Sequence, residues 1–179
     1  EEELLPFKPE PFFSPDLQHP LPHIPEIINN LLQAKRPVLL VGSGIRLANA
    51  EKKMLLLIES LGIPVLTSRR GADLLPDNHP LFFGRPGAYG QRSANFIIQN
   101  CDLLLSIGSR LALPLTGRNY RAFARGAKKI VVDIDPAELK KETTRPDKAL
   151  ACSADKFITA FLALAEKQSV FPRSSSLQD

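Results

Sequence analysis

The sequence has few of the residues that build disulfide frameworks, metal sites or membrane spans. Its 179 residues include two cysteines, which are too few for a disulfide scaffold and lack the spacing of metal ligands. We therefore expect Cys101 and Cys152 to be buried free thiols in a reducing compartment, the cytoplasm. The longest apolar runs, such as Met54–Ile58, are far shorter than the roughly 18–20 residues that cross a bilayer. The sequence opens on three glutamates instead of a basic and then apolar signal, so we expect neither a membrane span nor a secretory segment.

Motifs of conventional catalysis are also missing. No HExxH, G-x-S-x-G or Walker pattern occurs. The three histidines, His19, His23 and His79, all lie in proline-flanked segments, where a lone histidine is more often a surface residue than a general base. The residues themselves therefore predict no catalytic group and no metal site in this chain.

The charge balance is mildly basic, with 23 Lys and Arg against 19 Asp and Glu, a formal net charge of +4. Much of the excess falls in residues 110–129. A nucleic-acid interface would interleave aromatic residues with these charges, and only Tyr120 and Phe123 are present. A basic interaction domain stays open as one hypothesis, but we expect no nucleic-acid partner and interpret the stretch as a solvated face or an interdomain contact.

Proline divides the chain into three parts. Seven of the 16 prolines fall in the first 25 residues, so residues 1–23 are predicted to be an extended, proline-rich interdomain linker. Residues 24–168 have ordinary globular composition and are predicted to form one domain. Residues 169–179 are polar and serine-rich, which is typical of a frayed, flexible tail.

Within residues 24–168, short apolar runs alternate with helical periodicity. Helices are expected from Ile24 to Leu32, from Ala48 to Leu61, from Gln91 to Gln99 and from Ala154 to Gln168. Strands are expected at residues 37–41, 64–66, 81–83, 103–107, 129–134 and 149–152. This alternation predicts an α/β protein with an open, doubly wound, mainly parallel sheet of about six strands, a Rossmann-like fold of the DHS-like NAD/FAD-binding kind.

Small and polar residues follow the predicted strands, where ligands bind in such sheets. Glycine N–H groups and arginine suit phosphate oxygens, and an aspartate at a strand end suits ribose hydroxyls. The candidate nucleotide-binding residues are Gly42, Ser43, Gly44, Thr67, Ser68, Gly84, Arg85, Gly87, Gly108, Ser109, Arg110, Asp133 and Ile134.

Two features weaken a conventional dinucleotide site. Turns and helix caps use the same residue types for purely conformational reasons. Leu47 also stands where the dinucleotide fingerprint has its third glycine, and Arg69 and Arg70 replace the acid that would bind an NAD ribose. A stand-alone NAD- or FAD-binding module therefore stays open as the alternative function.

The ordered motifs resemble a known family. They are Arg36-Pro-Val-Leu-Leu-Val-Gly-Ser-Gly-Ile, Leu61-Gly-Ile-Pro-Val-Leu-Thr-Ser, Leu75-Pro-Asp-Asn-His-Pro-Leu-Phe-Phe-Gly, Cys101-Asp-Leu-Leu-Leu-Ser-Ile-Gly-Ser-Arg and Ile130-Val-Val-Asp-Ile-Asp-Pro-Ala-Glu-Leu. In this order and spacing, residues 31–164 resemble the central domain of thiamine-diphosphate-dependent enzymes of the acetolactate synthase type.

The resemblance implies a three-domain parent enzyme, of which this chain is the middle domain. Such enzymes decarboxylate a 2-keto acid on thiamine diphosphate and transfer the carbanion to a second carbonyl. The catalytic Glu belongs to the first domain and the Gly-Asp-Gly motif that binds Mg²⁺ and the diphosphate to the third. This chain has no Gly-Asp dipeptide, so it is expected to be catalytically inactive on its own. The expected partners are those two missing domains and further copies of the parent, as a homodimer or tetramer.

The resemblance also implies that the candidate residues above form an FAD site in acetolactate synthases, or an ADP site in CoA-linked relatives. This chain departs from the synthase pattern after Arg110: Leu111-Ala112-Leu113-Pro114 stands where synthases carry Phe-Asp-Asp-Arg. Arg69 and Arg85, which the synthase pattern does not contain, would either add phosphate contacts or obstruct the adenine. FAD, ADP and an empty, structural crevice therefore all stay open.

Overall fold

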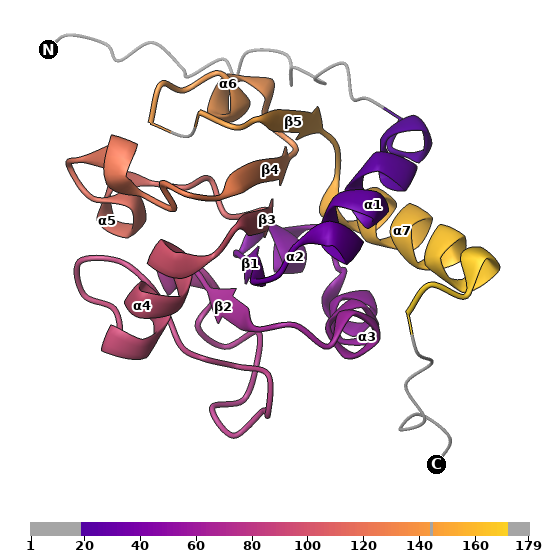
Figure 1. Ribbon diagram of the computed structural model, residues 1–179, viewed down its shortest axis with the longest axis horizontal. Coiled ribbons are helices and arrows are strands. Elements are labelled where there is room, and N and C mark those ends of the chain that lie inside the picture. Colours follow the sequence, from indigo (N-terminus) through magenta and orange to yellow (C-terminus); the bar gives the residue numbers. More distant parts are fainter. Residues whose placement is uncertain (1–18, 144, 172–179) are drawn as a thin grey trace, which may run out of the picture.

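The computed structural model describes residues 19–143 and 145–171, so most of the predicted linker and the tail from residue 172 lie outside the described residues. Within them, five strands form one parallel sheet (Figure 1). The strands are β1 (Pro37–Val41), β2 (Val65–Thr67), β3 (Leu103–Ile107), β4 (Lys128–Asp133) and β5 (Lys148–Ala151), in the spatial order β2-β1-β3-β4-β5. Helices cover both faces, which confirms the α/β, doubly wound, Rossmann-like prediction.

One predicted strand is wrong. Residues 81–83 contribute a single bridge, between Val65 and Phe82, and form no strand. The apolar run is only three residues long, Pro80 before it has no N–H to donate, and Gly84 after it turns the chain at φ +99°. The other five strands lie within one residue of their predicted positions.

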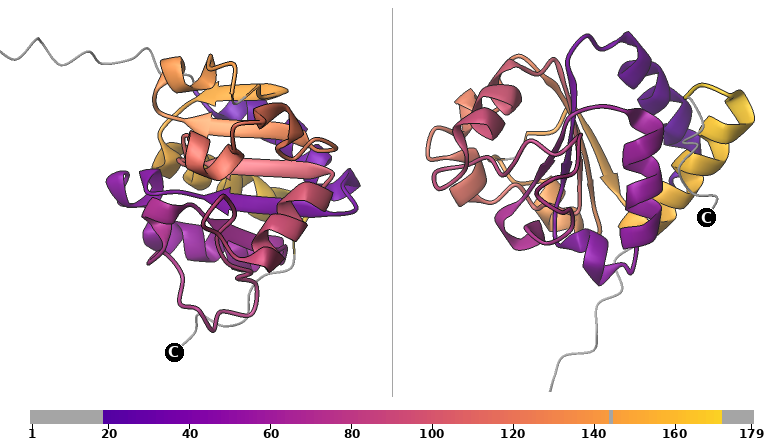
Figure 2. Two further views of the ribbon diagram at one scale, coloured as in Figure 1. Left: turned by 90° about the vertical axis from the view of Figure 1, so that its left-hand side faces the viewer. Right: turned by 90° about the horizontal axis from the view of Figure 1, so that it is seen from below.

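The strands are apolar throughout because both faces of the sheet are covered. Alternate residues point to opposite faces, so Leu39, Leu105 and Val132 join one buried cluster while Leu40, Leu104 and Val131 join another. We call the first the helical face, since α1 (Ile24–Gln33), α3 (Glu51–Leu61) and α7 (Ala154–Gln168) pack on it. The right-hand view of Figure 2 shows the sheet edge-on between its two covering layers.

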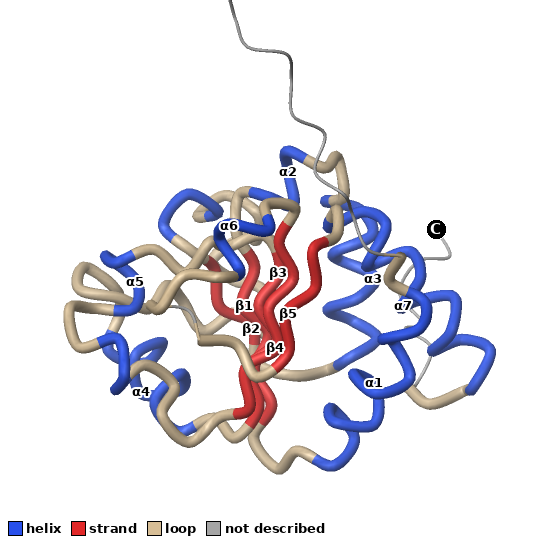
Figure 3. Tube along the Cα trace, turned by 90° about the horizontal axis from the view of Figure 1, so that it is seen from above, coloured by secondary structure: helices blue, strands red, loops and turns tan. Residues whose placement is uncertain are grey.

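The opposite side, which we call the loop face, has less regular cover. Its longest helix is α4 (Arg92–Asn100), and the rest is loops with the four-residue helices α5 (Leu113–Thr116) and α6 (Pro136–Leu139) and the 3-10 turn η3 (Tyr120–Ala122). Figure 3 shows α1, α3 and α7 on one side of the sheet and α4 and α5 on the other. Among the described residues, no helix has the length and apolarity to cross a membrane.

The helix predicted from Ala48 to Leu61 begins three residues later, as α3 at Glu51. Asn49 adopts a left-handed conformation (φ 53°), which separates α2 (Gly44–Leu47) from α3. Gly62 ends α3 at φ 61°, as its position in the sequence predicts. The other three long helices begin and end within one residue of the predicted positions.

The described chain continues beyond both predicted domain boundaries. The 3-10 turn η1 (Leu21–His23) leads directly into α1. After α7, Val170 and Phe171 pack against the cluster of the helical face, and the Phe171 ring stacks on Phe161 with 6.1 Å between centroids. The packed unit therefore extends to Phe171.

Candidate functional site

The sheet has its topological switch point between β1 and β3. The chain crosses to β2 on one side of β1 and to β3 on the other, so the connections after β1 and β3 diverge and leave a crevice at the carboxyl ends of the strands. A cleft of about 1420 Å³ lies there. Nine of the candidate residues line it: Ser43, Gly44, Ser68, Arg85, Gly108, Ser109, Arg110, Asp133 and Ile134.

Four candidates lie behind the cleft wall instead: Gly42, Thr67, Gly84 and Gly87. Thr67 is fully buried, and its hydroxyl has no hydrogen-bond partner among the described residues. The Gly84 carbonyl accepts from the Thr67 N–H (3.2 Å). Gly87 exchanges two hydrogen bonds with the Asn95 amide on α4, at 2.8 and 3.0 Å. These residues fix the loop that carries Arg85.

The glycines after β1 serve backbone packing. A Cβ on Gly42 would lie 2.3 Å from the Gly108 carbonyl oxygen, and one on Gly44 would lie 2.7 Å from the Gly108 Cα. The N–H groups of Gly42 and Gly44 donate to the carbonyls of Ile107 and Gly108, both at 3.0 Å. Because these donors are already used, they do not cradle a phosphate, and the glycines instead let the two loops of the switch point touch.

The loop after β3 has an unusual backbone. Gly108, Arg110 and Leu111 all have left-handed φ angles, of 61°, 57° and 42°. Such angles cost about 1–2 kcal/mol for each residue other than glycine, so the surrounding structure must hold them in place. The fully buried Leu111 side chain anchors the loop from below, and its N–H donates to the Ser109 hydroxyl at 3.4 Å. Anchored in this way, the loop presents Arg110 to the cleft.

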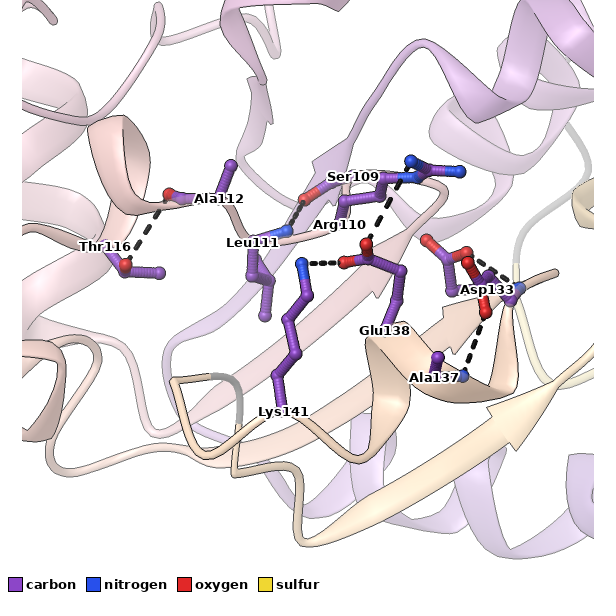
Figure 4. Close-up of polar contacts among 10 residues, drawn as sticks. Ser109, Arg110, Leu111, Ala112, Thr116, Asp133, Ala137, Glu138 and Lys141 are labelled. Carbon is purple, nitrogen blue, oxygen red and sulfur yellow. Dashed lines mark hydrogen bonds and ion pairs between the residues drawn. The ribbon is translucent and has the colours of Figure 1, made fainter.

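Arg110 is the exposed charge of this loop, with 61% of its side chain accessible. Its guanidinium lies 4.0 Å from the carboxylate of Glu138 on α6, which also pairs with Lys141 (Figure 4). Glu138 is therefore shared between two cations and holds Arg110 loosely at the rim. An anionic ligand can compete for this guanidinium at little cost.

Asp133 ends β4 with a buried carboxylate, only 4% exposed. One oxygen accepts from the Asp135 N–H at 3.0 Å. Burial raises the pKa of this carboxyl above its usual range, while the N–H groups of Asp135 and Arg110 and the Arg110 charge oppose the rise. Beside it, half-exposed Ile134 offers an apolar surface at the same end of the cleft.

Five arginines line the cleft: Arg46, Arg69, Arg70, Arg85 and Arg110. Arg46 pairs with Asp73, and Arg85 lies against the Phe82 ring. Arg46 and the exposed Tyr89 were not among the candidate residues, because helix α2 and the loop before α4 carry no strand-end signal in the sequence. Arg69 and Arg70 lie just after the end of β2, so their strand-end position is already visible in the sequence. The remaining lining residues are Leu47, Ala48, Pro86, Gly90, Ala112, Pro114, Leu115, Val132, Cys152, Ser153 and Ala154.

The donor set does not suit a metal–diphosphate centre. Across residues 19–143 and 145–171, no three His, Cys, Asp or Glu side chains gather closely enough to hold a metal ion. Both cysteines are buried free thiols, as the sequence predicts. Burial raises the pKa of Cys101 to about 11 and that of Cys152, at the cleft, above its usual value, so both are poor nucleophiles.

Comparison with known proteins identifies the family of this domain. The family model "Thiamine pyrophosphate enzyme, central domain" matches residues 24–161. A probable acetolactate synthase large subunit from Methanococcus aeolicus is 42% identical over 118 residues, which are 66% of this chain and 20% of that protein. The acetolactate synthase large subunit of Corynebacterium glutamicum is 41% identical over 118 residues, 66% of this chain and 19% of that protein.

The Escherichia coli acetolactate synthase isozyme 1 large subunit is 37% identical over 135 residues, 75% of this chain and 23% of that protein. The chain thus spans about a fifth of the length of these relatives. The resemblance inferred from the ordered motifs is confirmed, and the chain belongs to the family of thiamine pyrophosphate enzyme central domains.

Proposed function

We propose that this chain is the middle domain of an acetolactate synthase-like enzyme that decarboxylates a 2-keto acid and transfers the carbanion to a second carbonyl. The family match and the named relatives support this proposal, as does the fifth of their length that the chain covers. Thiamine diphosphate with Mg²⁺ supplies the chemistry in such an enzyme. No three metal-ligating side chains gather among the described residues, and we propose that the first and third domains of the parent hold the pair.

The role that we assign to this chain is scaffold and nucleotide site. The observation that carries it is the cleft at the switch point, where five arginines face one buried carboxylate. We propose that an adenine nucleotide such as FAD or ADP binds there. Arg110 would bind the diphosphate, and Asp133 with Ile134 would lie at the ribose and adenine. In this role a bound FAD is structural.

The proposal extends to the partner domains, the oligomeric state and the cellular location of the parent enzyme. We propose that the first and third domains pack against this chain and that the parent assembles as a dimer or tetramer. Exposed apolar side chains support such contacts: Phe83 in the loop after β2, Phe96 on α4 and Leu113 on α5. The buried free thiols agree with a cytoplasmic location.

A thermal-shift series with FAD, ADP, NAD and no ligand tests the nucleotide site. We expect stabilisation by at least one adenine nucleotide, because a ligand that binds only the folded state raises Tm. Arg110→Ala should weaken binding by about 1.5–3 kcal/mol, the scale of a lost charge-assisted hydrogen bond. Glu138→Gln should strengthen it, since the carboxylate that competes for Arg110 is neutralised.

Arg125→Ala serves as the matched control, because Arg125 is exposed and is not among the residues lining the cleft. It removes the same net charge and should leave the affinity unchanged. Equal losses in the Arg110 and Arg125 variants would reduce the effect to general electrostatics. No shift with any nucleotide would leave a purely structural domain.

A further inference from the structure

The arginines of the cleft differ in their ion pairs. Three of the five lie within 4.0 Å of a carboxylate: Arg46 with Asp73, Arg85 with Asp77, and Arg110 with Glu138. Arg69 and Arg70 are exposed and form no ion pair with any described residue. Of the described residues that line the cleft, Asp133 alone carries a carboxylate, and it lies three strands away from β2. The end of β2 therefore holds uncompensated positive charge.

These charges stand apart from the diphosphate position. Arg69 and Arg70 begin the 3-10 turn η2 (Arg69–Gly71), one residue after the end of β2, while Arg110 follows β3. Strand β1 lies between β2 and β3, so the two strand ends are two strand spacings, roughly 10 Å, apart. A diphosphate bound at Arg110 thus leaves the arginine pair facing another part of the ligand.

The position after β2 has a defined meaning in doubly wound sheets. An acid there binds the ribose hydroxyls of an adenosine, whereas arginine accommodates a phosphate. Guanidinium groups are suited to phosphate because they offer paired donors in a planar fork. Two adjacent arginines without carboxylate partners match a phosphate dianion in charge.

We propose that Arg69 and Arg70 bind a third phosphate, so that the preferred ligand of the cleft is an adenine nucleotide with three phosphates. FAD, NAD and ADP each carry only two. The inference rests on the proposed nucleotide site and specifies its substrate class. The third phosphate has two sources: the γ-phosphate of ATP, when the adenosine lies at Asp133 as proposed above, or a ribose phosphate, as in NADP and CoA, when the ligand lies in the opposite direction with its adenosine at the end of β2.

Calorimetric titration with three matched pairs tests this: ATP against ADP, NADP against NAD, and CoA against dephospho-CoA. Each pair differs by one phosphate. At about 150 mM salt and without divalent cations, we expect the triply phosphorylated member of at least one pair to bind about tenfold more tightly. A gain with NADP or CoA identifies the ribose phosphate, and a gain with ATP alone identifies the γ-phosphate.

The variant Arg69→Ala/Arg70→Ala should abolish that gain, so that the two members of the pair bind with equal affinity. Both side chains are exposed, so the fold should survive, as circular dichroism would show. Arg121→Ala/Arg125→Ala removes the same charge from exposed positions that are not among the cleft residues, and should retain the gain.

The outcomes separate the two proposals. If no nucleotide binds, the proposed site and this inference fail together. If ADP, NAD or FAD binds and the third phosphate adds less than about twofold, this inference is overturned while the nucleotide site stands. A gain that persists in the Arg69/Arg70 variant, or disappears equally in the control, also overturns it.

Discussion

The two faces of the sheet are built in different ways. On the helical face, α1, α3 and α7 contribute 10, 11 and 15 residues, and their apolar stripes fill a single cluster with the strands. On the loop face, only α4 is longer than one turn, and connections such as residues 84–91 are fixed by specific hydrogen bonds. Side-chain packing stabilises the first face, whereas backbone geometry shapes the second.

The helical face mainly provides stability, whereas the loop face provides much of the ligand-binding cleft. The cleft draws Arg85, Tyr89, Arg110 and Ala112 from the loops of the loop face. Irregular backbone there places exposed charges at chosen points, which a regular helix cannot do at the same positions. The three long helices of the helical face, α1, α3 and α7, contribute only Ala154 to this lining, so that layer can remain closely packed. Substitutions on the helical face should therefore mainly lower stability, whereas substitutions on the loop face should mainly weaken ligand binding.

The largest effect is expected on the helical face, from Phe161→Ala. Phe161 is fully buried and contacts the rings of Phe157 and Phe171, both at 6.1 Å between centroids. Its truncation should lower the free energy of unfolding by about 3–5 kcal/mol, because it removes a large apolar group and leaves a cavity. Urea denaturation measures this. A loss below about 1 kcal/mol would show that this layer is not closely packed.

A smaller loss is expected at the switch point, from Gly42→Ala. The φ of Gly42 is not left-handed, so the cost comes from the added Cβ, which would meet the backbone of Gly108 and Ser109 at 2.3 and 2.4 Å. Backbone on that side cannot rotate away, and we expect a loss of about 1–3 kcal/mol with weakened nucleotide binding. Gly126→Ala is the control, since its Cβ would come no nearer than 4.0 Å to other atoms. Equal Tm values for both variants would contradict the close contact of the two loops.

The sequence predicts the regular face well and the loop face poorly, for a physical reason. Amphipathic periodicity identifies α1 and α7, because each buries one stripe against the sheet. Short helices such as α5 and α6 depend on local turns and tertiary hydrogen bonds, which leave no period. The missing sixth strand and the late start of α3 have local causes instead: Pro80 and Gly84 bound the short run at residues 81–83, and the left-handed Asn49 precedes α3.

The candidate site divides along similar lines. Strand-end position correctly brings Arg110 and Asp133 to the cleft, because parallel strands end at one edge. The glycine motif is less informative, since Gly42 and Gly44 pack against Gly108. Composition cannot distinguish a glycine that approaches a ligand from one that approaches a neighbouring loop. Arg46 reaches the cleft from a helix that the sequence does not predict.

The backbone of the β3 loop gives a sharper contrast between stability and binding. Arg110 has φ 57°, so Arg110→Gly should be about 1 kcal/mol more stable than Arg110→Ala, while both lose nucleotide affinity equally. At Arg125, whose φ is not among the positive ones, the order should reverse, with glycine the less stable. Thermal unfolding of the four variants measures this. If the glycine and alanine variants had the same order of stability at both positions, the left-handed backbone at Arg110 would not be strained.

The smallest expected effect is on the pH dependence of stability, for two aspartates at opposite ends of the sheet. Burial raises the pKa of Asp133, so the folded state holds this proton more tightly than the unfolded state. Stability from this group therefore falls as the pH rises from its ordinary pKa of 3.8 through the raised folded value. Asp133→Asn should lack that part of the pH dependence.

Asp102, just before β3, should behave in the opposite sense. Burial favours its protonated form, but the N–H groups of Arg36 and Lys35 donate to its carboxylate at 2.9 and 2.8 Å, and the net effect lowers its pKa. Its contribution is present above the ordinary pKa of 3.8 and is lost as the pH falls through the lowered value. Urea titrations from about pH 3 to 8 should thus show wild type gaining on Asp102→Asn, and losing to Asp133→Asn, as the pH rises. If the two stability differences changed with pH in the same direction, burial would not raise the pKa of Asp133. The description of Asp133 as a buried carboxylate at the cleft would then be wrong.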